Sequence, residues 1–513
     1  MGTPPPKGLE TPTTKEPPRH VESSRRSRKP EVKEAVSQIR VALRDALPDA
    51  SFGEREAQAL AISNEAVREL LQQDLQAMSD GLGDEVLVNG VAYKEHAPGT
   101  DTYHSLCGPL RVDRPSFRRM GVHNGPIVIA LELAAGLVEG ATPALAYNVA
   151  HGYAQHDMRI HGEILETAHR LAPSRTTLER IAKRIAETAV EQCSRVEAVV
   201  RRAEKVPEEA VAISIGLDRT SAPMIEDRPK DAPPKPEPKR RRPRVRSAPA
   251  PYDINWRMAY VGTVCFVDGN GEALGTIRYA AAGCDDPREL VEKMTADVSA
   301  ALKRRPSLNV GIVQDGAPEM WNRTREGLQV LRNNGQLGAW HEAIDRYHLM
   351  ERLAVALKLV EPDMTDEERK ARLKAWTDLF DTMDTAIDYI EQILIKGYDA
   401  VPGDNREVLW DHLRFIRNNK DRMRYVTLRR AGLPVGSGVT ESTCKTVIGH
   451  RANGAGQRWR EAGLRGAVTL RALHQFTKRA TSATTCPNRA EPTSRNRCVM
   501  HTIRRRLRQR RRS

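Results

Sequence analysis

Two apolar runs, each followed at once by an aspartate, constrain the fold of this chain most strongly. The runs VAISIGL and LNVGIVQ end at residues 217 and 314, and Asp218 and Asp315 follow them. Short apolar runs rich in β-branched residues are typical of buried strands. Open α/β sheets collect their ligands at the carboxyl ends of strands. We therefore expect two strands of one sheet that bring both carboxylates to a shared edge.

The predicted elements around these strands indicate the type of sheet. The pattern gives strands at 211–217, 256–268, 273–282, 308–314 and about 340–344, with helices at about 286–304 and 317–333. A turn cluster at Asp268–Gly271 makes the second and third strands an antiparallel hairpin. The order βββαβα followed by βα is that of a ribonuclease-H-like domain, in which the first and fourth strands are neighbours. We expect an α/β fold of this class.

A third carboxylate completes the candidate site. Glu441 lies in a helix-start pattern, GSGVTESTCK, after a helical stretch at 346–430. Mg²⁺ takes a few carboxylate oxygens and keeps water and phosphate for its remaining positions. Two such ions about 3.5–4 Å apart activate the attacking oxygen and stabilise the leaving one. We expect Asp218 to bridge two Mg²⁺ ions, with Mn²⁺ as a possible substitute, and Asp315 and Glu441 to complete one ion each.

The rest of the chain divides into further regions. Residues 1–32 read as a disordered Pro-rich basic tail, 33–205 as a helical region with a β-element at about 84–118, and 206–480 as the domain that carries the three acids. Within that domain we predict a disordered loop at 226–251 and a helical insertion at about 346–430. Residues 481–513 form an Arg-rich tail, also predicted to be disordered.

Local signals place several elements of the N-terminal region. Asn89-Gly90 between apolar runs predicts a hairpin. Thr142-Pro143 predicts a helix start, and Thr176 with Glu179 a capping box. The helices between 142 and 190 fit either a helix-turn-helix or ordinary helical packing, and the sequence does not decide between them.

Charge and cysteine usage narrow the class of partner and compartment. Lys and Arg outnumber Asp and Glu by 81 to 67, a net charge of +14, which favours a polyanionic partner. Much of this excess lies in the C-terminal tail. Seven cysteines occur singly, so neither a zinc ribbon nor a disulfide framework is indicated. The chain has no apolar run of about 18 residues, so we expect a soluble cytoplasmic protein that does not bind membranes.

The acidic motifs resemble those of one enzyme family. The stretches LDRTS around Asp218, QDGAPEMW around Asp315 and GSGVTES around Glu441 look like the three motifs of DDE transposases of bacterial insertion sequences, and are most similar to the ISKra family, which is distantly related to Mutator-like transposases. The segment IDRYH, with Asp345 and His348, resembles an Asp-x-x-His signature of the wider group, and RANGAGQRW resembles the segment after its glutamate. The resemblance covers roughly residues 100–480.

The resemblance implies an activity and a set of partners. It implies metal-dependent DNA strand cleavage followed by strand transfer of the exposed 3′-hydroxyl, on double-stranded DNA of the element ends and the target. On this reading, residues 33–205 are the DNA-binding region and residues 206–480 the catalytic domain. It further implies a homodimer or higher multimer in the bacterial cytoplasm, associated with the nucleoid. Asp345 and His348 would be auxiliary to the three catalytic acids, or would only hold the fold.

Basic residues near these motifs are candidate DNA contacts. We predict that Lys445, Arg451, Arg458, Arg219 and Arg175 contact DNA, each with a plain surface role as the alternative. Trp321 and Trp459 are expected in the core. Two other functions stay open: a ribonuclease-H-like nuclease or resolvase without strand transfer, and a catalytically silent DNA-binding protein.

Overall fold

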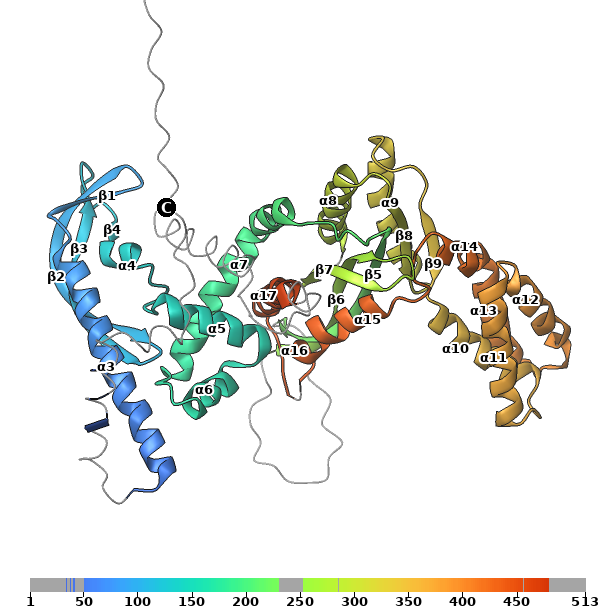
Figure 1. Cartoon of the computed structure of the whole chain (residues 1–513), viewed down its shortest axis with the longest axis horizontal. Coiled ribbons are helices and arrows are strands. Elements are labelled where there is room, and N and C mark those ends of the chain that lie inside the picture. Colours follow the sequence, from blue (N-terminus) through green and yellow to red (C-terminus); the bar gives the residue numbers. More distant parts are fainter. Residues whose placement is uncertain are drawn as a thin grey trace, which may run out of the picture.

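The molecule is elongated, with a β-rich end, a group of helices, a central sheet and a helical lobe following one another (Figure 1). The computed structural model describes residues 50–229, 252–284, 286–454 and 456–478, and the single residues 34, 37, 40 and 41. The two predicted terminal tails, most of the predicted helical stretch at 33–49 and the predicted loop from residue 230 onward lie outside this part. In the described part, no helix is long and apolar enough to cross a membrane.

The N-terminal β-element forms where the Asn89-Gly90 signal predicts it. It comprises β1 Glu85–Val88, β2 Val91–Ser105, β3 Gly108–Arg119 and β4 Ile127–Val128, covered by helix α3 Phe52–Asp80. Val88 pairs with Val91 across the turn, and Asn89 and Gly90 take φ angles of 58° and 77°. Two positive φ angles are what a type I′ turn requires, so the hairpin prediction is confirmed.

Four helices follow the β-element: α4 Ala130–Ala135, α5 Pro143–Gln155, α6 Met158–Thr167 and α7 Arg175–Ala203. The predicted start of α5 is confirmed, because the Thr142 side chain accepts from Leu145 N–H and Pro143 is the first helical residue. The predicted capping box in α7 is wrong. Ser174 caps this helix by accepting from Thr177 N–H, and Glu179 pairs with Arg175 at 2.7 Å instead.

The central sheet contains the elements predicted for 206–345, in the same order along the chain. Its strands are β5 Ala212–Asp227, β6 Tyr252–Val267, β7 Ala273–Ala282, β8 Asn309–Gln314 and β9 His341–Ile344. They lie in the order β7-β6-β5-β8-β9, with α8 Arg288–Arg304 and α9 Pro318–Asn333 joining the later strands. β5 runs parallel to β8 and β8 parallel to β9, while β5, β6 and β7 are antiparallel. The mixed α/β architecture is therefore as expected.

Strand β5 is longer than the sequence predicts. It continues past Asp218 to Asp227, paired with β6 up to Tyr252, so that the two strands extend beyond the rest of the sheet as a ribbon. Ala222 and Met224 of this extension are buried against Trp459, and Ile225 N–H donates to the Trp459 carbonyl at 2.7 Å. The strand continues because the distant segment around Trp459 completes its hydrogen bonds. The polar sequence after Leu217 does not indicate this partner.

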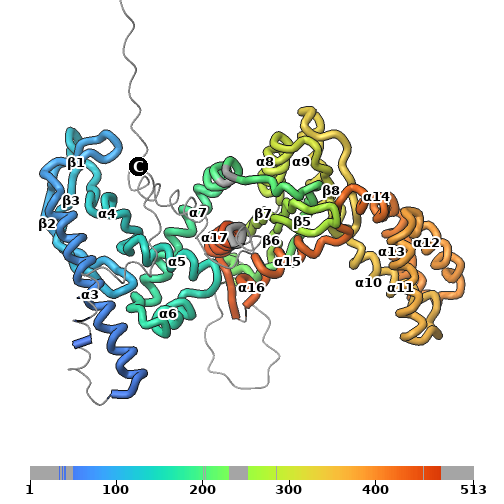
Figure 2. The backbone as a smooth tube through the Cα atoms, in the orientation of Figure 1, coloured from blue at the N-terminus to red at the C-terminus, as the bar shows by residue number. Residues whose placement is uncertain are grey.

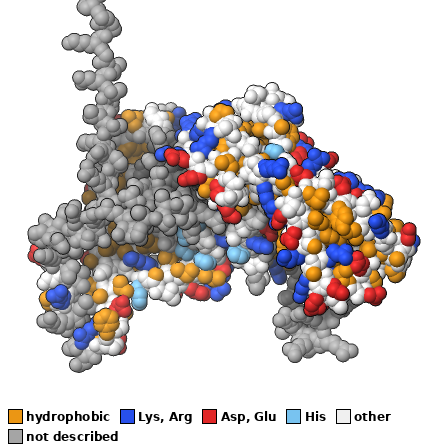
Figure 3. Space-filling model, turned by 45° about the vertical axis from the view of Figure 1, so that its right-hand side comes forward, with side chains coloured by type: hydrophobic (Ala, Val, Ile, Leu, Met, Phe, Trp, Pro, Cys, Tyr) orange, Lys and Arg blue, Asp and Glu red, His pale blue; other side chains and the backbone are white. Residues whose placement is uncertain are grey.

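The predicted helical insertion forms a separate lobe. It comprises α10 Arg346–Val360, α11 Asp366–Thr382, α12 Ala386–Lys396, η1 Tyr398–Ala400, α13 Gly403–Asn419, η2 Lys420–Arg422 and α14 Tyr425–Arg430. Trp376, Phe380 and Tyr425 are buried within it. Its surface mixes hydrophobic and charged side chains (Figure 3).

The last elements return to the sheet and join it to the N-terminal helices. They are α15 Gly438–Thr443, the π-helical η3 Cys444–Gly449, α16 His450–Ala452 and α17 Glu461–Lys478. Helix α17 lies between the sheet and the helices α5 and α7 (Figure 2). Arg471 of α17 is buried and donates to the Ala154 carbonyl of α5 at 2.7 Å. The two regions that the sequence separates near residue 205 therefore share a helix.

Two glycines let helices approach the two faces of the sheet. A Cβ on Gly262 would lie 2.2 Å from the Met294 sulfur of α8. A Cβ on Gly216 would lie 2.0 Å from Thr440 Oγ1 of α15 on the other face. Successive strand residues alternate between faces, so Asp218, two positions after Gly216, belongs to the α15 side.

Gly216→Ala should therefore displace α15 and reduce stability. Overpacking of this kind costs about 1–3 kcal/mol, and thermal unfolding measures it. Gly275→Ala is the matched control, because its Cβ would meet only Phe266 at 3.9 Å in the same sheet. Equal melting temperatures of the two variants would contradict the close contact.

Candidate active site

Three aspartates are brought side by side by the register of the parallel strands. Ala212 of β5 pairs with Asn309 of β8, and Asp218 and Asp315 are offset by the same number of positions. Gln314 pairs with Ile344 of β9, so Asp315 and Asp345 follow in the same register. Asp345 N–H donates to the Gln314 carbonyl at 2.9 Å, which extends the ladder to this edge. The predicted meeting of Asp218 and Asp315 at one edge follows from this geometry, and Asp345 joins them.

Helix α15 carries Glu441 to the same edge from one face of the sheet. Its Thr440 hydroxyl shares a 2.7 Å hydrogen bond with Thr263 of β6. Arg278 of β7 donates from Nε to Thr443 Oγ1 at 3.1 Å. Glu441 thus extends from a helix fixed on both sides by buried hydrogen bonds, and its side chain stays partly exposed. The helix start predicted around Glu441 is confirmed.

Asp218 lies close enough to two other acids for their charges to affect its pKa. Burial raises the pKa of Asp218, and the charges of Asp315 and Glu441 raise it further. Hydrogen bonds from Arg219 N–H and the Cys444 thiol oppose this rise only in part. The raised pKa means that the ionised Asp218 is destabilised by its surroundings. A cation at this place would remove that destabilisation.

Cys444 belongs to the wall of the site. Burial raises the pKa of its thiol to about 12, and the nearby Asp218 adds to the rise, so the group stays a protonated donor. It begins the π-helical η3, whose Val447 and Ile448 are buried against β5 and β6. Single π-helical turns occur often at functional sites. Here the wide turn follows the helix that carries Glu441.

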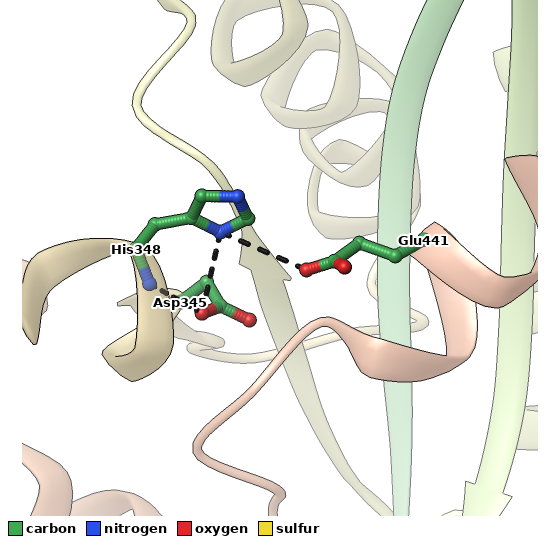
Figure 4. Close-up of side chains that lie close together, drawn as sticks. All are labelled: Asp345, His348 and Glu441. Carbon is green, nitrogen blue, oxygen red and sulfur yellow. Dashed lines mark hydrogen bonds and ion pairs between the residues drawn. The ribbon is translucent and has the colours of Figure 1, made fainter. Parts of the chain in front are cut away.

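Asp345, His348 and Glu441 form a compact group (Figure 4). One ligand atom from each of the three lies within 4.8 Å of the others. His348 Nδ1 is 3.4 Å from Asp345 Oδ1 and 3.7 Å from Glu441 Oε1, and it has no well-formed hydrogen bond. Among the described residues, Asp218, Asp315 and Glu441 do not form so tight a group. The structure therefore groups the predicted auxiliary pair with Glu441.

Asp345 also holds this part of the fold together. It caps α10 by accepting from His348 N–H at 3.0 Å, and it accepts from the Ser437 hydroxyl at 2.8 Å and from Ser437 N–H. Burial would raise the pKa of Asp345, but the hydrogen bonds from Ser437 and His348 more than offset it and lower the pKa. Because Ser437 directly precedes α15, Asp345 fixes the start of the helix that bears Glu441.

The residues at this edge suit a divalent cation. The donors are carboxylate oxygens from four acids and one imidazole nitrogen, and His348 Nδ1 lacks a hydrogen-bond partner. Carboxylate ligands favour Mg²⁺ and Mn²⁺, whereas an imidazole ligand also suits softer metals. One such group that could hold a metal is the Asp345, His348 and Glu441 cluster.

The predicted DNA contacts divide into accessible and inaccessible side chains. Lys445 is exposed and 3.8 Å from Glu441, Arg458 is exposed, and Arg175 is exposed at the start of α7. Arg219 lies partly exposed beside Asp218 and pairs with Glu319. Arg451 differs, because only 3 % of its surface is exposed.

The prediction for Arg451 needs correction on physical grounds. Its guanidinium lies over the rings of Trp459 and Tyr153, at 4.4 and 5.3 Å, and donates to the Tyr153 carbonyl. Burial lowers its pKa to about 10. A phosphate would have to unpack this contact between α16 and α5, so Arg451 has a structural role. Trp321 and Trp459 are buried, as expected.

Arg352 is a basic residue near the site that the sequence motifs do not single out. It lies one helical turn after His348, is exposed, and stacks 4.2 Å above the Phe415 ring. Phe415 in turn packs against Gly316, where a Cβ would come within 2.2 Å of the ring, directly after Asp315. The sequence does contain a signal for Arg352, because a spacing of four residues places it on the same helix face as His348.

No protein-family model matches this chain, and no curated protein is significantly similar to it in sequence. The functional conclusion therefore depends on the chemistry of the site.

The repulsion at Asp218 predicts an effect on stability. Its pKa is raised in the folded protein, so its ionised form lowers stability at neutral pH, and this destabilisation disappears as pH falls through the raised pKa. Asp218→Asn should raise the melting temperature of the metal-free protein, by about 2–4 °C per kcal/mol for a domain of this size. Mg²⁺ or Mn²⁺ should raise it in the wild type and much less in the variant.

The control is Asp227→Asn, on the same strand but paired with Arg460 at the surface. This variant should respond to metal as the wild type does. A wild-type melting temperature that is insensitive to both metals would contradict a cation site at this edge.

Proposed function

We propose that this protein is a DDE-type DNA transposase of an insertion sequence, similar to the ISKra family. It would cut DNA strands in a metal-dependent reaction and transfer the exposed 3′-hydroxyl to target DNA. The observation that supports this most is the convergence of Asp218, Asp315 and Glu441 at one edge of a sheet, where their charges act on one another.

The proposal includes a ribonuclease-H-like catalytic domain. The strand order β7-β6-β5-β8-β9, with the first three strands antiparallel and the last two parallel to β5, supports it. So does the helical lobe inserted between β9 and the helix with the glutamate. Both features agree with the family resemblance of the acidic motifs.

Each acid has a proposed role. Asp218, central among the strands, would bridge two Mg²⁺ or Mn²⁺ ions, and Asp315 and Glu441 would each hold one. Bound ions would supply Lewis-acid stabilisation and activate the attacking oxygen. Asp345 would orient α15 and His348, and the His348 imidazole would support Glu441 from 3.7 Å.

The remaining residues would position DNA. Lys445 lies 3.8 Å from Glu441 and would contact a phosphate near the reacting bond, as would Arg352 beside Phe415. Arg219 follows Asp218 but pairs with Glu319, and it would contact a phosphate on the other face of the strand. Arg458 and Arg175 would bind the strand farther away. The N-terminal β-element and helices would recognise the element ends, and a homodimer or larger multimer would hold two ends together.

The catalytic assignment is tested by three conservative substitutions. Asp218→Asn, Asp315→Asn and Glu441→Gln should each reduce strand cleavage of cognate ends in Mg²⁺ or Mn²⁺ by at least about 10³-fold, because charge stabilisation is removed. Binding of the ends, measured by mobility shift, should persist. Glu326→Gln is the control, because this exposed acid of α9 pairs with Arg323 outside the row of acids. Near-normal cleavage by any of the three would remove that residue from the site.

A strand-transfer assay separates the proposal from the leading alternative. Pre-cleaved ends and a target plasmid should give joined products that disappear with Glu441→Gln. A ribonuclease-H-like nuclease or resolvase would cut branched DNA and give no joined product. Binding without cleavage in any metal would identify a silent DNA-binding protein.

A further inference from the structure

An arginine-rich cavity lies beside the edge strand β9, outside the acidic site. It is open, has a volume of about 560 Å³, and is lined by α9, β9, the end of α13, η2 and α14. Glu342 and Asp345 lie three residues apart along β9 and its end, about 10 Å between their Cα atoms, and this odd spacing turns their side chains to opposite faces of the sheet. The cavity therefore adjoins the catalytic edge without sharing its acids.

The inner wall of the cavity is a network of hydrogen bonds and ion pairs in which most of the charge is neutralised. Glu342 accepts from Arg325 Nε at 2.7 Å, from Arg422 Nε at 3.0 Å and from Trp340 Nε1 at 3.1 Å. The Arg422 guanidinium lies 4.4 Å over the Trp321 ring and donates to Asn419. One half-buried carboxylate thus faces two guanidinium groups, and a positive charge remains.

Two more arginines at the mouth add to this excess. Arg332 is exposed, and its guanidinium lies 6.0 Å from the centroid of the Trp340 ring. Arg424 pairs with Asp421, but this carboxylate is 90 % exposed and the pair is weak. Four arginines and two carboxylates thus line the cavity, and one of the carboxylates, Asp421, is almost fully exposed to solvent. An anion would bind favourably here.

We infer that this cavity binds a backbone phosphate of the DNA that passes through the catalytic edge. The inference rests on the proposed function. Arginine forks match phosphate oxygens in geometry and charge. A distance of about 10 Å corresponds to about three steps along a DNA strand, at 3.4 Å per step. The phosphate bound here would fix the direction of the strand without reading its sequence.

The test removes the two arginines at the mouth and uses a third arginine, matched to Arg424, as the control. Arg424→Ala and Arg332→Ala, singly and combined, remove charge from the mouth. Arg414→Ala is the control, because Arg414 is also 61 % exposed and also pairs with an aspartate three residues before it, outside the cavity. Affinity for a DNA duplex is measured without divalent ions between about 50 and 200 mM salt.

The double variant should bind DNA several-fold more weakly, and its salt slope should fall by about 0.9 for each phosphate that the protein no longer neutralises. The control should keep both values. An unchanged slope in the double variant, or equal changes in Arg414→Ala, would overturn the inference. Because binding is measured without metal, it does not depend on cleavage. If the double variant shows a reduced salt slope but the wild-type protein cleaves no DNA, only the proposed function is contradicted.

A second arm separates DNA from a free anion. Inorganic phosphate should compete weakly with DNA, and it should compete less against the double variant. If phosphate instead raises the melting temperature of the wild type alone while DNA binding is equal in both proteins, the cavity serves a free anion and the inference is wrong.

Discussion

The common register of β5, β8 and β9 is the constraint on which the site depends. It sets Asp218, Asp315 and Asp345 in one row, because each aspartate has the same offset from the paired residues of its strand. A shift of one residue in any strand would turn its acid to the opposite face. The buried apolar residues of these strands, such as Ile215, Ile312 and Ile344, therefore fix the site indirectly. The residues that pack the core therefore also set the positions of the acids.

Within the row of acids, the protein destabilises the anion of one aspartate and stabilises the anion of another. Asp218 keeps a raised pKa among like charges, whereas Asp345 is stabilised as an anion by hydrogen bonds from Ser437 and His348. The two carboxylates thus have different tasks at one edge. Asp345 holds helix α15 in place, and Asp218 remains available for a ligand that brings positive charge.

Much of the architecture follows from local patterns in the sequence. The order of strands and helices from 212 to 344, the Asn89-Gly90 hairpin and the Thr142 cap were all predictable, because each depends on near neighbours. Other features depend on partners far along the chain. The extension of β5 needs Trp459, and the burial of Arg451 needs Tyr153. The Ser174 cap was missed because several hydroxyl residues compete within four positions.

Helix α17 has a consequence for how the protein is made. Its residues fill two cores at once, since Leu470 joins the cluster of α5 and α7 while Leu464 and Val468 join that of β5 and β6. This helix follows all the described strands in sequence. During synthesis, contacts such as Arg201–Asp297 and Arg451–Tyr153 can already join the two halves, but the shared packing of α17 forms only after residues 461–478 have left the ribosome. The helix that packs against both halves is thus the last of the described elements to be made.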